Sequence, residues 1–327
     1  MSFLDFRKKY KVPPTPNLRE PSFEECIDAF INKYLFINNL NPDNDTIDYS
    51  AFISIFCDKE EDIGSNFKEQ QKLMQLVKQQ GYQTAPQISD DRIIFIHISG
   101  KDGLNEKKDL DMVKLYINCD RKNISLITNL IFQKIRIIVG TKLQLKCISE
   151  QYVDWCKEAE NNSVIKNYQR NDKIVIYAEN PHMAELIAEQ INELRREHPE
   201  LFSSEKTLPF IPKKYGFIGF VSKKSSDYAR TPLGIASGST YNDYISNLIF
   251  CCTISGFDKY FGIDSHSNRD NVEERMIKYA ELYQNMTQTE KSVILRNIKE
   301  IFEQVSRDSN VQTSYFTPVE SDAPVQE

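Results

Sequence analysis

The chain has 327 residues, of which 40% are hydrophobic, and its 41 Lys and Arg against 47 Asp and Glu give a net charge of −6. This acidic balance argues against a general nucleic-acid binder, which needs a broad basic face. Because no apolar run approaches about 18 residues and the start lacks the apolar stretch of a signal peptide, we expect a cytoplasmic protein without a membrane partner.

The first 21 residues contain four prolines among charged residues and are predicted to form a flexible arm. Residues 22–90 are predicted to be rich in helix. Ser22 and Glu25 have the spacing of a capping box, and apolar residues then recur every three or four positions as far as Leu35. This spacing predicts an amphipathic helix with one buried face.

A second helix is predicted over 66–80. Asn66 and Glu69 have the spacing of another capping pair, and Gly81 follows the last apolar residue, where a helix commonly ends.

Residues 91–262 are predicted to form an α+β core. Runs of β-branched and apolar residues predict strands, and amphipathic stretches between them predict helices. From Met112 onward the order is β-α-β-β-α-β, which is the ferredoxin-like order, with two helices on one face of an antiparallel sheet. The predicted strands cover 92–99, 112–119, 142–148, 173–178 and 216–222, and the predicted helices cover 123–139 and the stretch from Pro181 to Leu194.

The C-terminal part is predicted to be helical. Helices are expected over 243–255, 271–284 and 287–305, and those within 263–306 form a separate C-terminal region. The polar residues 307–327 are predicted to be a disordered tail.

The seven cysteines are odd in number, scattered and never spaced as CxxC, which disfavours disulfides and zinc. The acidic segment 42–48 does not form an EF-hand, because Asp48 stands where the loop requires glycine. We therefore expect no metal site.

The segment 208–242 differs from the rest of the chain because cations, glycines and aromatic residues gather in it. Lys and Arg bind phosphate or carboxylate through charge-assisted hydrogen bonds, and glycine lets a backbone approach a ligand. The segment predicts an anion-binding loop, although paired lysines beside a strand also occur as a solvated edge that discourages strand association. Its single acid is Asp227, its cations are Lys213, Lys214, Lys223, Lys224 and Arg230, and its glycines are Gly216, Gly219, Gly234 and Gly238.

Four stretches between residues 90 and 255 share their order and spacing with a known family. They are the strand Lys114 to Asn118, the Tyr168-x-Arg170-x-Asp172 lead into the next strand, the helix after Pro181, and Pro209-Phe210-x-x-Lys213 before a glycine-containing loop. In these features the chain resembles the HopA1-like proteins, named for a plant-pathogen type III effector and also found as lyase components in lanthipeptide and thioamide-peptide biosynthesis. The resemblance covers about half of the chain.

The resemblance implies elimination of phosphate from phosphoserine or phosphothreonine in a ribosomal peptide, which leaves a dehydroamino acid. It also implies a kinase-like partner that installs the phosphoryl group, and it implies neither a metal nor a cofactor. Where the family ends its loop with Ser-Phe-Gly-x-x-Arg, this chain has Ser237-Gly238-Ser239-Thr240-Tyr241. If the family's arginine binds the leaving phosphate, either Arg230 replaces it in this chain or the activity is lost.

The elimination needs a base for the Cα proton and an acid for the leaving phosphate. Lys146, in the predicted strand TKLQLKCI, and Lys213, in the basic loop, are candidates for the base. His97 and Tyr241 are candidates for the acid, although a lone histidine in a strand is more often structural.

The leaving phosphate also needs cations to hold it. Arg170, Lys214 and Arg230 are the candidates. Arg170 with Asp172 can equally form a structural ion pair at the start of a strand.

Two further functions stay open from the sequence. The principal alternative to a lyase is a non-enzymatic effector or scaffold, which binds a partner protein through the basic aromatic loop and is secreted as an effector. The other is an enzyme acting on a small phosphorylated molecule. GxxxxGK[ST], GxSxG and HExxH are all absent from the chain.

Overall fold

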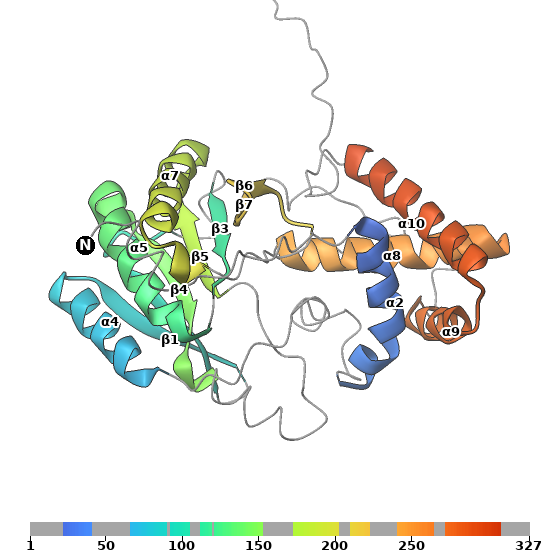
Figure 1. Ribbon diagram of the computed structural model, residues 1–327, viewed down its shortest axis with the longest axis horizontal. Helices are drawn as coiled ribbons and strands as arrows, with labels where there is room; N and C mark the ends of the chain where they lie inside the picture. The colour runs from blue at the N-terminus through green and yellow to red at the C-terminus, as the bar shows by residue number, and fades with distance from the viewer. Residues whose placement is uncertain are drawn as a thin grey trace, which may run out of the picture.

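The computed structural model describes residues 22–40, 66–89, 92–104, 112–119, 121–152, 173–202, 210–222, 241–264 and 272–308. These residues form a sheet with helices on one side and a group of further helices next to it (Figure 1). The predicted arm 1–21, residues 153–172, the stretch 223–240 of the basic loop and residues 309–327 of the predicted tail lie outside the described residues.

The described strands form one seven-stranded sheet in the order β1-β2-β4-β5-β3-β7-β6, in which every neighbouring pair is antiparallel. Its combination with helices confirms the predicted α+β class. The strands are β1 (Gln83–Ser89), β2 (Arg92–Ser99), β3 (Val113–Ile117), β4 (Gln144–Ile148), β5 (Ile174–Ala178), β6 (Lys213–Lys214) and β7 (Ile218–Ser222).

Strand β1 is not among the strands predicted from the sequence. Its sequence, QTAPQIS, lacks both a β-branched run and a regular alternation, and it contains Pro86. Proline is tolerated there because β1 is an edge strand that pairs only with β2 among the described residues.

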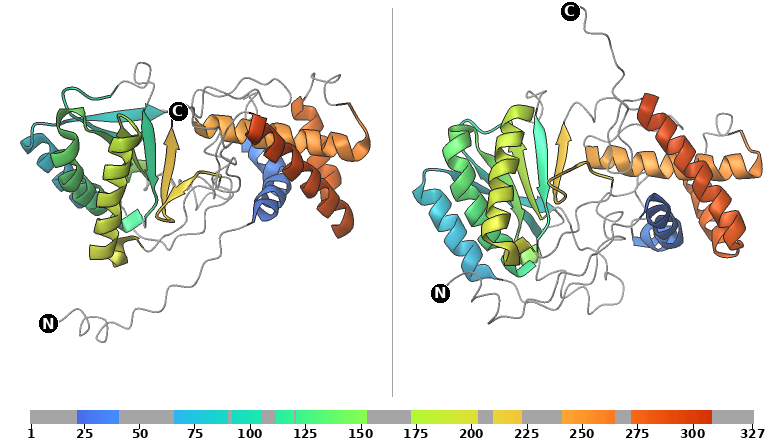
Figure 2. Two further views of the ribbon diagram at one scale, coloured as in Figure 1. Left: turned by 90° about the horizontal axis from the view of Figure 1, so that it is seen from above. Right: turned by 45° about the horizontal axis from the view of Figure 1, so that its top comes forward.

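Three helices cover one face of the sheet: α4 (Phe67–Gln79), α5 (Ile124–Val139) and α7 (Pro181–Glu197), as Figure 2 shows from two further directions. Helix α5 lies between the other two, because it contacts both. It places Ile127, Ile131 and Ile135 against the sheet without any exposure, and full burial of such a side chain contributes about 1.5–3 kcal/mol.

The second group of helices comprises α2 (Phe23–Leu40), α8 (Tyr241–Phe261), α9 (Val272–Gln284) and α10 (Gln288–Asp308). Their apolar side chains form one core with residues from the other face of the sheet, among them Tyr116, Val175 and Tyr177. The part of the sheet formed by β3, β5 and β7 is therefore buried on both faces, by different sets of helices.

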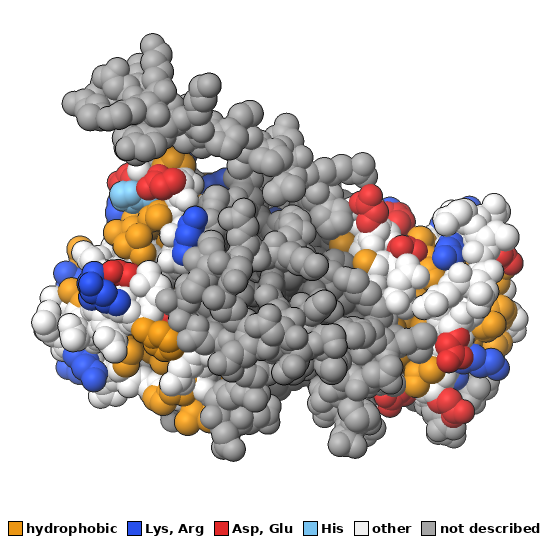
Figure 3. Space-filling model, turned by 60° about the horizontal axis from the view of Figure 1, so that its bottom comes forward, with side chains coloured by type: hydrophobic (Ala, Val, Ile, Leu, Met, Phe, Trp, Pro, Cys, Tyr) orange, Lys and Arg blue, Asp and Glu red, His pale blue; other side chains and the backbone are white. Residues whose placement is uncertain are grey.

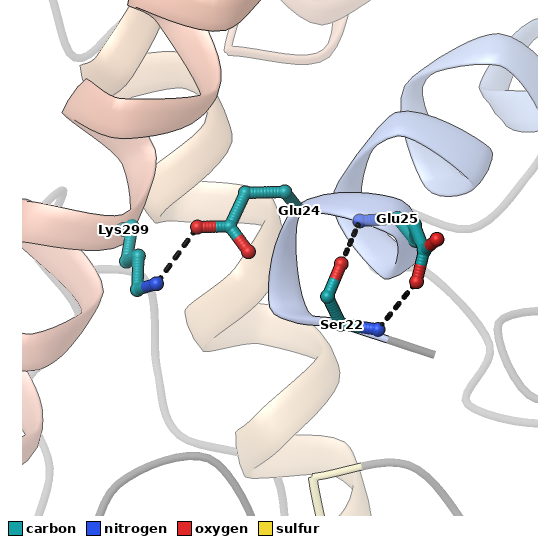
Figure 4. A network of polar contacts seen from close by, with 4 residues as sticks. All are labelled: Ser22, Glu24, Glu25 and Lys299. Carbon is teal, nitrogen blue, oxygen red and sulfur yellow. Dashed lines mark hydrogen bonds and ion pairs between the residues drawn. The ribbon is translucent and has the colours of Figure 1, made fainter. Parts of the chain in front are cut away.

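The predicted capping box at the start of α2 is confirmed. The Ser22 backbone N–H donates to the Glu25 carboxylate at 2.7 Å, and the Glu25 N–H donates to Ser22 Oγ at 3.2 Å (Figure 4). Beside it, Lys299 of α10 forms an ion pair with Glu24 at 2.7 Å, which fastens α2 to α10.

The prediction of a capping pair at Asn66 was wrong. The Asn66 side chain makes no capping hydrogen bond. Instead, the buried carboxylate of Glu150 accepts hydrogen bonds from the Asn66 N–H at 2.8 Å and from Ser125 Oγ at 3.1 Å. An acid 84 residues away along the chain thus fixes the starts of α4 and α5 next to each other.

The expectation that no apolar stretch is long enough for a membrane span also needs correction. The helical segment Ile124–Lys142, which contains α5, is long and apolar enough to cross a membrane by length and composition alone, with a mean hydropathy of 1.3. It is a packed helix of the core, since its inner side covers the sheet.

Candidate functional site

Cross-strand pairing places three of the four candidate catalytic residues on one line across the sheet. His97 of β2 pairs with Lys146 of β4, and Lys146 in turn pairs with Val175 of β5. The line continues through Tyr116 of β3 and Gly219 of β7 to Lys213 of β6. Paired residues in an antiparallel sheet direct their side chains to the same face, so His97, Lys146 and Lys213 share a face.

This face is the one opposite α5. Cys147, the neighbour of Lys146, has its thiol in a hydrogen bond with Thr128 of α5, and burial raises the pKa of that thiol to about 12. Because successive strand residues alternate between the two faces, Lys146 points away from α5.

His97 and Lys146 form the compact part of the line, because they are direct neighbours on adjacent strands. His97 Nε2 lies 2.9 Å from the side-chain oxygen of Gln87 on β1, which orients the ring. The Lys146 ammonium lies 4.2 Å from the centre of the Phe95 ring, within the range of a cation–π contact. Both side chains are half-buried. The pair therefore consists of an imidazole oriented by Gln87 and an ammonium over an aromatic ring, and both are partly accessible to solvent.

Lys213 lies at the far end of the line. Four strand spacings separate it from Lys146, which amounts to about 19 Å between their backbones. The residues between them, Val175 and Tyr116, are 1% and 5% exposed. Lys146 and Lys213 therefore cannot act on the same atom of a small substrate.

Two lysines without a predicted role share the same face. Lys114 of β3 lies two residues before Tyr116, and its ammonium is 5.4 Å from the centre of the Tyr177 ring. Lys173 is 2% exposed and donates to the Cys119 carbonyl at 2.5 Å. The alternation in the strand VKLYI could have placed Lys114 on this face from the sequence alone.

Lys214 does not join the other candidates. It pairs with Ile218 in the β6–β7 ladder and so points to the opposite face from Lys213. There it forms an ion pair at 2.5 Å with Glu185 of α7, and the hydrogen bond to that carboxylate raises the pKa of Lys214. A phosphate-binding role for Lys214 stays a prediction without geometric support.

Two of the glycines in the basic loop serve the fold. Tyr215 and Gly216, with φ values of 53° and 76°, form the two-residue turn between β6 and β7, closed by a hydrogen bond from the Phe217 N–H to the Lys214 carbonyl at 3.3 Å. A Cβ on Gly219 would lie 3.0 Å from Ile211 and 3.1 Å from Tyr116. Both glycines are thus explained by a tight hairpin and its packing.

The remaining candidates are not placed by the structure. Tyr241 is the first residue of α8, but its side chain lies outside the description, as do Arg170 and Arg230. Within the described ranges, no group of three or more His, Cys, Asp or Glu residues is arranged to hold a metal ion.

No protein-family model matches the chain, and no curated protein matches it significantly. Two solved structures, both described as effector proteins, are similar to it over most of its length. The structure from Pseudomonas syringae pv. syringae strain 61 covers 80% of this chain and 94% of that chain, at 14% identity and a TM-score of 0.38. The structure from Pseudomonas syringae pv. tomato strain DC3000 covers 71% and 95%, at 12% identity and a TM-score of 0.36. A likeness at this level carries no argument about function.

Proposed function

We propose that this protein is a lyase that eliminates phosphate from a phosphoserine or phosphothreonine residue of a peptide, with His97 and Lys146 as its acid–base pair. The observation that carries the proposal is their direct pairing across β2 and β4 on one face of the sheet. The elimination needs two proton-transferring groups within reach of one side chain, and a cross-strand pair has Cβ atoms only about 5 Å apart.

In the proposed step, the Lys146 ammonium first gives a proton to solvent, and the neutral amine then takes the proton from Cα of the phosphorylated residue. The electrons of that C–H bond form the Cα=Cβ double bond, and the bond between Cβ and the ester oxygen breaks. Protonated His97 gives its proton to the departing phosphate. The products are a dehydroamino acid and inorganic phosphate, and the proton that Lys146 holds returns to His97 through water before the next turnover.

Lys114 is the described cation best placed to hold the phosphate. It lies on the same face, two strands from Lys146 and two residues further along, which is about 12 Å between backbones and within reach of two extended side chains. Lys114 takes the phosphate-binding role that was predicted for Lys214, because Lys214 points to the other face of the sheet. Arg170 and Arg230 stay candidates for the same role. The proposal includes a kinase-like partner that phosphorylates the peptide, and it requires neither a metal nor a cofactor.

One observation favours the alternative, a non-enzymatic effector or scaffold that binds a partner protein. Lys146 and Lys213 lie about 19 Å apart across the sheet, with the buried residues Val175 and Tyr116 between them. This arrangement suits a partner protein that contacts the two lysines at separate points better than one phosphate group.

We also propose that the chain from β3 to β7 is an elaborated ferredoxin-like unit. Its support is the spatial order β4-β5-β3-β7, with α5 and α7 on one face. In this description β1 and β2 extend the sheet at one edge and β6 extends it at the other.

Mass spectrometry of a phosphothreonine peptide incubated with the protein tests the lyase. Wild type should release one phosphoric acid from the peptide, and His97→Gln and Lys146→Gln should lower the rate by about 100-fold or more. Lys101→Gln, an exposed lysine on the turn after β2, is the matched control and should react like wild type.

Lys213→Ala separates the two functions. If His97 and Lys146 form the catalytic site, Lys213→Ala should keep the turnover rate of wild type, because Lys213 lies about 19 Å from Lys146. An absence of dehydrated product, together with peptide binding that is weakened by both Lys146→Gln and Lys213→Ala, would contradict the lyase and support the scaffold.

A further inference from the structure

The outer surface of α4 and α5 has a charge opposite to that of the whole chain. Residues 66–80 and 121–142 contain eight Lys and Arg but one acid, Glu69, although the chain as a whole carries −6. The stretch around α5 has no acid at all. The eight cations are Lys68, Lys72, Lys78, Arg121, Lys122, Lys134, Arg136 and Lys142.

The two helices run side by side in the same direction, so their cations belong to one surface. Glu150 joins their starts by accepting from Asn66 and Ser125. At their other ends, the Tyr82 hydroxyl after α4 donates to the Gly140 carbonyl after α5 at 3.2 Å. The surface is about 20–24 Å long, given the lengths of the two helices.

Among the residues that the structure describes, ion pairs engage three of these cations. Lys134 pairs with Glu197 at 3.0 Å, Lys142 pairs with Glu179, and Lys72 pairs with Glu69 at 2.5 Å. These acids of α7 and its N-terminal flank lie along one side of α5. The exposed cations Lys68, Lys78 and Lys122 therefore make α4 and the adjoining start of α5 the most basic part of the surface.

Large apolar side chains project from the same surface. Ile137 of α5 is 77% exposed, Phe67 of α4 is 40% exposed and Leu126 of α5 is 38% exposed. Figure 3 shows lysine and arginine side chains next to hydrophobic ones over this part of the molecule, at the left. We define the α4–α5 surface by its exposed residues Phe67, Lys68, Lys72, Lys78, Lys122, Leu126 and Ile137.

We propose that the α4–α5 surface binds the face of a membrane that contains anionic lipid. Lysines attract anionic headgroups, and their aliphatic stems allow the ammonium groups to stay at the headgroups while apolar neighbours enter the interface. Phe67, Leu126 and Ile137 are the side chains that enter it. The helices lie on the membrane without crossing it, because Ile127, Ile131 and Ile135 of α5 are committed to the sheet.

The distribution of the apolar side chains favours a membrane over an acidic protein. Leu126 and Ile137 are separated by about 16 Å along α5, and exposed Gln133 lies between them. A stable protein interface usually needs a continuous apolar centre within about 800 Å² per partner. Lipids in a fluid bilayer can rearrange around each inserted side chain, so the apolar residues need not be adjacent. The α4–α5 surface lies on the opposite side of the sheet from His97 and Lys146. Membrane binding therefore leaves the proposed lyase site accessible to a peptide.

Sedimentation with vesicles tests the proposal. The full chain should sediment with vesicles of equal parts phosphatidylserine and phosphatidylcholine but not with phosphatidylcholine alone, and high salt should release it. Lys68→Glu combined with Lys78→Glu should weaken binding at least tenfold. The matched control, Lys278→Glu with Arg296→Glu on exposed positions of α9 and α10, makes the same change in charge and should stay within twofold.

Ile137→Gln tests the apolar contribution and should weaken vesicle binding several-fold. Its control is Leu282→Gln, at a residue of α9 that is 41% exposed, which should have no effect. Circular dichroism melts of all variants establish that they fold.

Absence of binding to the anionic vesicles, or equal losses in the two double variants, would overturn the proposal. Retention on immobilised polyglutamate without vesicle binding, lost in the Lys68/Lys78 variant, would also overturn it and indicate an acidic protein as the partner.

Discussion

The ring of Phe210 lies 5.8 Å from the ring of Phe23 in an edge-to-face arrangement. Phe210 precedes β6, whereas Phe23 begins α2, and both rings also contact Phe302 of α10. This aromatic cluster therefore joins the hairpin that carries Lys213 to the second group of helices. Phe210 has a φ of 66° and no exposure, so a bulky residue is held in the left-handed region by its packing.

Phe210→Ala should lower the free energy of unfolding by about 3–5 kcal/mol, the usual cost of removing a buried phenylalanine side chain. Phe210→Gly should cost about 1 kcal/mol less than Phe210→Ala, because glycine adopts a positive φ without strain. Urea unfolding of both variants measures the difference. The opposite order, with glycine the more destabilising, would show that the backbone strain is absent.

Helices α8 and α10 cross closely at Gly256, where a Cβ would lie 2.3 Å from Ile298 Cγ1 and 3.1 Å from the Ile298 backbone nitrogen. Gly256→Ala should therefore destabilise the protein by about 1–3 kcal/mol. The loss should be smaller when it is measured in an Ile298→Ala background, since the nearest atom is then gone. Equal losses in the two backgrounds of this double-mutant cycle would rule out the close contact as the cause.

Stability should fall as the pH rises from about 10 to about 12. Burial, followed by a hydrogen bond to Asp258 at 2.5 Å, raises the pKa of Tyr279 to about 12. An unfolded chain loses the tyrosine proton near pH 10. The stabilisation is thus complete below pH 10 and is lost as the pH approaches 12, because the folded state then binds more protons than the unfolded state.

Tyr279→Phe should make that alkaline decline shallower, although it lowers stability at neutral pH by removing the hydrogen bond to Asp258. Thermal melts between pH 8 and pH 12 measure it against wild type. Burial also raises the pKa values of Tyr34 and Tyr283. These two tyrosines account for the alkaline loss of stability that remains in Tyr279→Phe. An unchanged slope in the variant would contradict the assignment to Tyr279.

The two helix starts should respond differently to loss of the capping residue. Ser22→Ala should cost about 1 kcal/mol, because the Ser22 hydroxyl accepts from the Glu25 N–H. Asn66→Ala should cost much less, since the Asn66 side chain makes no capping bond. Chemical unfolding of the two variants compares them directly.

Glu150→Ala should cost more than Asn66→Ala, since it leaves the Asn66 N–H and the Ser125 hydroxyl without their acceptor. Each buried group left unpaired costs about 1–3 kcal/mol. A larger effect of Asn66→Ala than of Glu150→Ala would contradict the assignment of Glu150 as the residue that fixes the start of α4.

Features that depend only on neighbouring residues could be predicted from the amino-acid sequence. The capping box at Ser22, the helices α5 and α10, and the strand β2 follow from spacing of three or four residues or from a β-branched run, and each lies close to its predicted bounds. His97 and Lys146 are likewise candidates from their residue types within predicted strands. No local pattern shows that they are neighbours across the sheet.

Tertiary structure alone decided which distant residues meet. Strand order brought His97 opposite Lys146 and separated Lys146 from Lys213 by about 19 Å, because sheet pairing depends on the packing of whole strands and leaves little trace in either strand's sequence. The same holds for Glu150, which accepts the hydrogen bond from the Asn66 N–H at the start of α4, and for Lys214, which the strand alternation directs towards Glu185. Long-range contacts of this kind arise from the burial of the two sheet faces, which no short window of sequence contains.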